Sequence, residues 1–165
     1  MTSKESDERY TPQWLVEAAR EAMGGIDMDP ASCLEANLRI GSTRYLSLED
    51  DGLATAWVTP GYTTAVWCNP PYSRGSMIKW VKRFVDQSQH FAVGCLLVNS
   101  NTSAKWFRLL FDEMPALFLK NRLTFHPQPT PAFWPSCLFV GGCDRALVEH
   151  VQAELNDLGV WAVAE

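Results

Sequence analysis

The sequence predicts an α/β protein whose single sheet is covered by helices on both faces. Apolar runs alternate with helical patterns, as where Ala65-Val66-Trp67-Cys68 precedes apolar residues at helical spacing from Met77 to Val85. The predicted strands carry almost no charge, which is typical of parallel strands buried on both faces. A length of 165 residues suits one domain. We therefore expect a compact single sheet flanked by helices.

The first predicted helix runs from residue 13 to residue 23. Thr11 is a good N-cap, Pro12 suits the first helical position, and Gly24-Gly25 ends the pattern. Helical spacing predicts a buried stripe made of Trp14, Leu15, Ala18, Ala19 and Ala22. A short strand is then expected over residues 26–29, where it ends in an acidic residue before Pro30.

The remaining elements continue the alternation of helices and strands. We expect helices near residues 32–38, 77–85, 103–111 and 144–158. Further strands are expected over residues 63–68, 91–98, 116–119 and 136–140. A loop rich in proline and aromatic residues, 126–135, separates the last two strands.

The charge is unevenly distributed along the chain. The formal net charge of −5 argues against a protein that holds nucleic acid by bulk charge. Residues 61–125, however, hold eight basic and three acidic residues, whereas residues 1–60 and 126–165 are both acidic. The basic segment therefore predicts that any binding of nucleic acid is confined to one face and depends strongly on salt.

Other sequence features exclude several classes of protein. No apolar run is long enough to span a membrane, and the charged first residues do not resemble a signal peptide. The five cysteines and three histidines are scattered without metal-ligand spacing, so we expect no metal site. Reduced, mostly buried thiols and a cytoplasmic location are expected.

The tetrapeptide Asn69-Pro70-Pro71-Tyr72 directly follows a predicted buried strand, where open α/β sheets place their ligands. An exocyclic amine on a base is a poor nucleophile, because its lone pair is delocalised into the ring. Two hydrogen-bond acceptors on its N–H groups favour a pyramidal nitrogen that can attack a methyl donor. The Asn69 amide oxygen and the Pro70 carbonyl can supply them from a turn fixed by two prolines. Tyr72 can stack on an extruded base.

Further motifs accompany this tetrapeptide in a fixed order. They are Tyr10-Thr11-Pro12, Asp27-x-Asp29-Pro30-Ala31, Asp50-Asp51-Gly52-Leu53, Trp67-Cys68-Asn69-Pro70-Pro71-Tyr72-Ser73, Lys105-Trp106-Phe107 and Arg122-x-x-Phe125. With this set, the chain resembles the phage-type DNA adenine N-6 methyltransferases (the phage Dam family) over residues 10–142. Two features depart from the family pattern: the loop after Asp29 has no glycine, and Asn121 stands where the family has glycine.

The resemblance implies a Rossmann-like fold and S-adenosylmethionine as methyl donor. It also implies one methyltransferase domain over residues 1–165, with residues 1–9 flexible, no separate target-recognition domain and a phage or prophage origin in a bacterial host. The residues that would line the donor pocket are Tyr10, Thr11, Pro12, Asp29, Pro30 and Ala31. Asp27 or Asp29 would accept from the amino group or the ribose hydroxyls of the donor. Asn69, Pro70, Pro71 and Tyr72 would hold a flipped adenine.

Double-stranded DNA is the expected partner, and a homo-oligomer remains open. The candidates for DNA contacts are Arg74, Lys79, Arg122 and Trp134. Arg74 follows the tetrapeptide closely and suits a phosphate contact, whereas for Lys79 a DNA contact and a place on a solvated helix face are both open. The loop 126–135 either presents its aromatic side chains for insertion between base steps or packs Phe133 and Trp134 on the core.

Two other functions are compatible with the sequence. The same tetrapeptide serves amino-group methyltransferases that act on RNA or on a glutamine of a protein. A nucleic-acid-binding module that kept the fold but lost activity is the alternative from another class.

Overall fold

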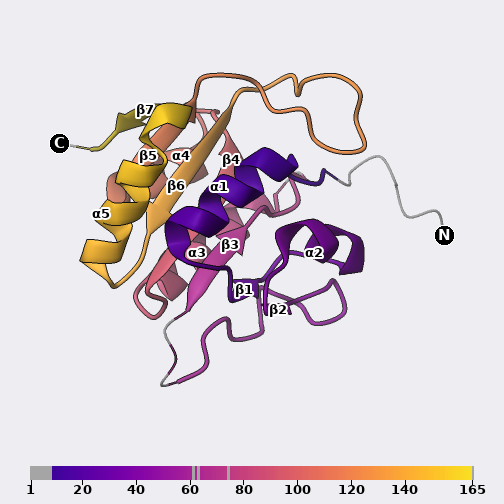
Figure 1. Ribbon diagram of the computed structural model, residues 1–165, viewed down its shortest axis with the longest axis vertical. Helices are drawn as coiled ribbons and strands as arrows, with labels where there is room; N and C mark the ends of the chain where they lie inside the picture. The colour runs from indigo at the N-terminus through magenta and orange to yellow at the C-terminus, as the bar shows by residue number, and fades with distance from the viewer. Residues whose placement is uncertain (1–8, 61, 63, 74, 165) are drawn as a thin grey trace.

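The computed structural model describes residues 9–60, 62, 64–73 and 75–164 (Figure 1). Its strands are β1 (Met28–Asp29), β2 (Arg44–Tyr45), β3 (Ala65–Cys68), β4 (Val93–Asn99), β5 (Ala116–Leu119), β6 (Ser136–Gly141) and β7 (Gly159–Ala162). Its helices are α1 (Gln13–Met23), α2 (Leu34–Ile40), α3 (Met77–Ser88), α4 (Lys105–Glu113), α5 (Arg145–Glu154) and the short 3-10 helix η2 (Asn156–Leu158). The expected flexible segment, residues 1–9, lies outside the described residues except for Arg9.

The seven strands form one sheet in the order β2-β1-β3-β4-β6-β5-β7. The pairs β2–β1, β1–β3 and β3–β4 are parallel, whereas β6 is antiparallel to both of its neighbours and β7 is antiparallel to β5. The chain leaves β1 for β2 at one edge but leaves β3 for β4 in the opposite direction. Such a reversal opens a crevice at the carboxyl ends of the two strands.

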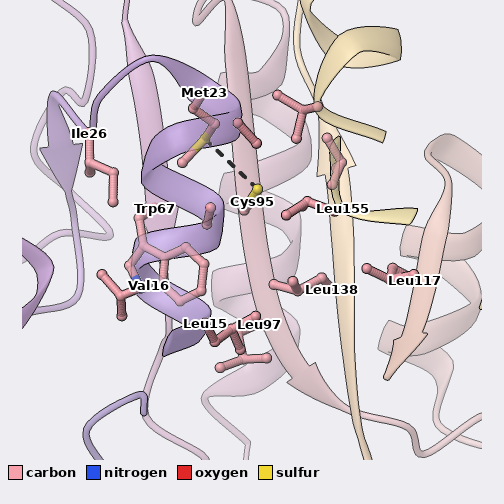
Figure 2. Close-up of a cluster of buried hydrophobic side chains, with 14 of the residues drawn as sticks. Leu15, Val16, Met23, Ile26, Trp67, Cys95, Leu97, Leu117, Leu138 and Leu155 are labelled. Carbon is pink, nitrogen blue, oxygen red and sulfur yellow. Dashed lines mark hydrogen bonds between the residues drawn. The ribbon is translucent and has the colours of Figure 1, made fainter. Parts of the chain in front are cut away.

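Helices cover both faces of the sheet. Apolar residues of α1 and α5 form one core with the sheet, and α3 and α4 form a second core on the other face (Figure 1). Figure 2 shows the first core, where Leu15 lies beside Leu97 and the Cys95 thiol donates to the sulfur of Met23 at 3.8 Å. The strand β3 is buried at all four residues, with Trp67 in the first core and Val66 in the second. This explains why its sequence carries no polar side chain.

Several predicted details of the elements are wrong. Trp14 is 48% exposed, and the buried face of α1 consists instead of Leu15, Val16, Ala19, Ala22 and Met23. Pro12, not Thr11, occupies the N-cap position, because Pro12 keeps an extended ψ of 139°. The last long helix ends at Glu154, four residues earlier than predicted, and the chain then forms β7. Neither β7 nor the two-residue β2 was predicted.

No helix within the described residues combines the length and the apolar character needed to cross a bilayer.

A loop between β2 and β3 packs tightly against the loop after β1. A Cβ atom on Gly52 would lie 1.9 Å from the carbonyl oxygen of Pro30, so only glycine fits there. The Gly52 carbonyl accepts a hydrogen bond from the indole nitrogen of the buried Trp57 at 2.7 Å. The two loops are therefore held in direct backbone contact.

We expect the substitution Gly52→Ala to lower the free energy of unfolding by roughly 2–3 kcal/mol, because two backbone segments must separate. Gly24→Ala is the matched control: its Cβ would meet no atom within 4 Å, and only the positive φ of 73° opposes it. That control should cost about 1 kcal/mol. Urea denaturation measures both, and equal losses would contradict a steric role for Gly52.

Candidate active site

A cavity of about 690 Å³ lies at the reversal point between β1 and β3. We call it the main cavity. Its wall is built by residues 9–11 before α1, by residues 29–33 after β1, by α2, by residues 46–53 and by residues 69–73 after β3. Four stretches of the chain that are separate in the sequence therefore meet at the carboxyl edge of the sheet, where the topology predicts a ligand.

The amide of Asn69 has a defined orientation at this wall. Its Nδ2 donates to the backbone oxygen of Arg9 at 2.9 Å and to the hydroxyl oxygen of Thr11 at 3.2 Å. Because a carbonyl oxygen can only accept, the nitrogen must face Arg9. The Oδ1 of Asn69 is then left buried with no hydrogen-bond partner among the described residues. Such an acceptor costs about 1–3 kcal/mol when it is unpaired.

Two hydrogen bonds hold the rest of the tetrapeptide, one at Pro71 and one at Tyr72. The carbonyl oxygen of Pro71 accepts from the Ser76 hydroxyl at 3.0 Å. The carbonyl oxygen of Pro70, by contrast, accepts from no protein donor within the described residues. The Tyr72 hydroxyl donates to the Leu97 carbonyl oxygen at 3.0 Å, which fixes its half-buried ring. Burial raises the pKa of Tyr72 well above its usual range, so the phenol stays protonated and keeps this bond.

Asp29 brings a buried carboxyl group to the main cavity. Its side chain is 2% exposed, and Oδ1 accepts from the Ala31 backbone N–H at 3.1 Å. Burial raises the pKa of Asp29 to about 7, and the hydrogen bonds from Ala31 and Ser32 offset only part of that rise. The carboxyl group is therefore poised to ionise near neutral pH, or when a cation enters the cavity.

The structure brings only some of the predicted donor-pocket residues together. Tyr10, Thr11, Asp29, Pro30 and Ala31 line the main cavity.

Asp27 and Pro12 are not part of the cavity wall. The Asp27 carboxylate instead accepts the Ala65 backbone N–H at 2.8 Å, at the amino end of β3. The two acidic residues lie at opposite ends of β1: Asp27 precedes the strand at the amino edge of the sheet, whereas Asp29 ends it at the carboxyl edge, beside the cavity. A donor contact of Asp27 or Pro12 therefore stays a prediction that the cavity wall does not support, and Pro12 is the N-cap residue of α1.

Other residues at the cavity wall were not predicted. Arg9 and Arg39 bring positive charge to it, and Ser47 and Asp51 bring oxygen atoms. The acidic run that contains Asp51 was a visible signal in the sequence. Arg9 and Arg39 carried no signal, because each is one cation in an ordinary helical or terminal segment.

Of the predicted DNA-contacting residues, Lys79, Arg122 and Trp134 lie outside the main cavity. Arg74 is not among the described residues, while Lys79 and Arg122 are exposed. Phe133 is 78% exposed and Trp134 is 52% exposed, so the expectation that they pack on the core is wrong. Their rings contact each other edge to face with centroids 5.5 Å apart.

The loop 126–135 is anchored at the same end of the sheet as the cavity. The backbones of Tyr10 and His126 pair by two hydrogen bonds, and Ser100, which follows β4, donates its N–H to the Pro135 oxygen at 2.8 Å. The exposed aromatic pair therefore belongs to the edge that carries the tetrapeptide.

Within the described residues, no group of three or more His, Cys, Asp or Glu side chains is arranged to hold a metal ion.

Comparison with known proteins identifies the family. A search of curated proteins finds no match. A family model described as DNA N-6-adenine-methyltransferase (Dam) matches residues 1–132, which include every segment of the main cavity. The single seven-stranded sheet between helices is the Rossmann-like fold of methyltransferases. Because the match covers most of the sequence, the chain belongs to the DNA N-6-adenine-methyltransferase (Dam) family.

Proposed function

We propose that this protein transfers a methyl group from S-adenosylmethionine to the N-6 amino group of an adenine that is flipped out of duplex DNA. The observation that carries the proposal is the amide of Asn69. Its nitrogen donates to the Arg9 backbone oxygen and the Thr11 hydroxyl, and its oxygen has no partner in the part of the protein that the structure describes. An amino group that donates to this oxygen would recover the cost of its burial.

The second acceptor for the amino group is the carbonyl oxygen of Pro70. It lies on the next residue, and no described protein donor occupies it. With Asn69 and Pro70 accepting from the two N–H groups, the nitrogen lone pair turns out of the ring plane toward the methyl group. Tyr72 offers a ring of fixed position for stacking on the base.

The donor fits the main cavity in size and in chemistry. A volume of about 690 Å³ can take a nucleoside with an amino-acid chain. When bound, S-adenosylmethionine would supply a methyl group activated by the positive charge on sulfur. Asp29 would accept from its amino group or its ribose hydroxyls, and Arg9 or Arg39 would pair with its carboxylate. The loop after Asp29 has no glycine, and it packs instead against Gly52 of the neighbouring loop at the Pro30 carbonyl oxygen.

DNA would lie across the carboxyl edge of the sheet. Lys79 and Arg122 are exposed cations of the basic segment, and Arg74 follows the tetrapeptide in the same segment. Phe133 and Trp134 would insert between base steps or stack on the bases that lose their neighbour when the adenine flips out. Of the two alternatives, RNA or protein methylation is disfavoured by the family match, and an inert module is tested by the first variant below.

We expect Asn69→Ala to reduce methyl transfer to plasmid DNA by at least about 100-fold, because one of two acceptors for the amino group is lost. Donor binding, measured by calorimetry, should change little. Asn121→Ala replaces an exposed asparagine and serves as the control. Nucleoside mass spectrometry identifies the product. Wild-type rates in the Asn69→Ala variant would contradict the proposed role, and the absence of methyladenine with the wild-type chain would favour an inert module or another substrate.

The pKa of about 7 at Asp29 makes donor binding depend on pH. Only the ionised carboxylate attracts the cationic donor, so the dissociation constant should rise about tenfold when the pH falls from 8 to 6. The Asp29→Asn variant should bind S-adenosylmethionine weakly at both pH values. Any pH dependence that remains in this variant comes from other groups, including the donor itself, and can be subtracted. Asp27→Asn, outside the cavity, should retain the wild-type pH dependence. A flat profile in the wild-type protein would contradict the role of Asp29.

We expect Trp134→Ala to weaken binding of duplex DNA by roughly tenfold, since stacking contributes about 1–3 kcal/mol per base. Its free energy of unfolding should be nearly unchanged, because the ring is half exposed. The control is Tyr62→Ala, which removes an exposed ring before β3, at the opposite edge of the sheet. Fluorescence anisotropy measures both affinities, and equal effects would rule out a specific contact by Trp134.

A further inference from the structure

A second cavity of about 250 Å³ borders the same tyrosine as the main cavity. It lies between the loop after the tetrapeptide, the start of α3, the loop after β4 and Trp106 of α4. Tyr72 and Ser73 line both cavities, while the other residues of this one are separate from the main cavity. We call it the Tyr72 recess. Its volume suits a single ring system rather than a whole nucleoside donor.

Two asparagines give the Tyr72 recess a hydrogen-bonding wall. Asn99, the last residue of β4, has a buried Oδ1 to which no described residue donates a hydrogen bond. Asn101 accepts the Ser103 hydroxyl on its own Oδ1 at 2.8 Å, which leaves the amide nitrogen to donate. The recess therefore presents an acceptor and a donor, two residues apart in a loop that is closed by the hydrogen bond from Ala104 N–H to the Asn101 carbonyl.

Aromatic and apolar side chains complete the wall. The ring of Tyr72 is fixed by its hydroxyl bond to Leu97, and Trp106 is half buried against Phe107 with centroids 5.8 Å apart. Met77 and Ile78 add apolar surface from the start of α3. Flat aromatic walls with a few convergent polar groups are the arrangement that proteins use to bind unstacked bases.

We propose that the Tyr72 recess binds a second adenine of the recognition sequence, distinct from the adenine that is methylated. The base edge offers a donor at N6 and an acceptor at N7, which match the Asn99 oxygen and the Asn101 nitrogen. The inference rests on the proposed function, because it requires DNA to lie across the carboxyl edge with the target base at Asn69. Asn99 and Asn101 then determine sequence specificity and take no part in the methyl transfer.

A randomised duplex library tests this assignment. The library is incubated with the protein and S-adenosylmethionine, and both the methylated and the bound duplexes are sequenced. The wild-type protein should prefer adenine at one position besides the methylated one. Asn101→Asp replaces a donor by an acceptor, and it should lower that preference about tenfold or more and favour cytosine, whose N4 amine donates. Asn156→Asp, an exposed change of the same kind on η2, should keep the wild-type preference.

Two further measurements make the outcome decisive. Asn101→Ala removes the donor without adding charge, so it should lose the same preference, and circular dichroism confirms that each variant folds. A uniform loss of affinity over all sequences, an unchanged preference in both variants, or a wild-type protein with no preference beyond the methylated adenine would overturn the assignment. If the wild-type chain forms no methyladenine, the proposed function fails. The sequences of the bound duplexes, compared between the wild-type protein and the Asn101 variants, then show whether the recess selects a base.

Discussion

The parallel pairing of β1 with β3 is the contact on which the whole site depends. Met28 pairs with Val66, and the Asp27 carboxylate binds the Ala65 N–H at the amino end of the pair. Because the two strands run in the same direction, Asp29 and Asn69 leave them at the same edge. Because their onward connections diverge, the space between those two residues stays open. A slip of one residue would exchange the faces of Val66 and Trp67, and the two apolar cores oppose it.

The elements next to the tetrapeptide could be predicted from sequence because their patterns allow few alternatives. The strand at residues 65–68 is an uncharged run before two prolines, and the helix that begins at Met77 has a sharply amphipathic pattern. By contrast, β2 is two polar residues at a sheet edge, and β7 begins with glycine after a helix, so neither carries a local signal. Spacing locates a helix face only to within about one residue. Trp14 lies at the margin of that face, and its burial could not be decided locally.

The chemistry proposed for the site comes from four consecutive residues, but the geometry of the site could not be predicted from them. The two oxygen atoms that orient Asn69 belong to Arg9 and Thr11, roughly sixty residues earlier, and only the folded sheet brings them together. Similarly, the choice between Asp27 and Asp29 depends on which end of β1 borders the crevice, because Asp27 precedes the strand and Asp29 ends it. The exposure of Phe133 and Trp134 also follows from the fold, because the backbone pairing at His126 and Pro135 holds the loop 126–135 at the sheet edge.

The contact between Gly52 and Pro30 bears on how cofactor sites are recognised in sequences. A glycine in the loop directly after the first strand is the usual signature of a nucleotide site, since it lets another group approach the backbone. Here the loop after β1 has no glycine, and the residue without a side chain, Gly52, comes from a different loop and lies directly against the Pro30 carbonyl oxygen. A motif that is contiguous in one protein can thus be divided between two segments in another. A glycine that allows a close backbone contact is therefore better identified by its position in the folded structure than by its position in a sequence motif.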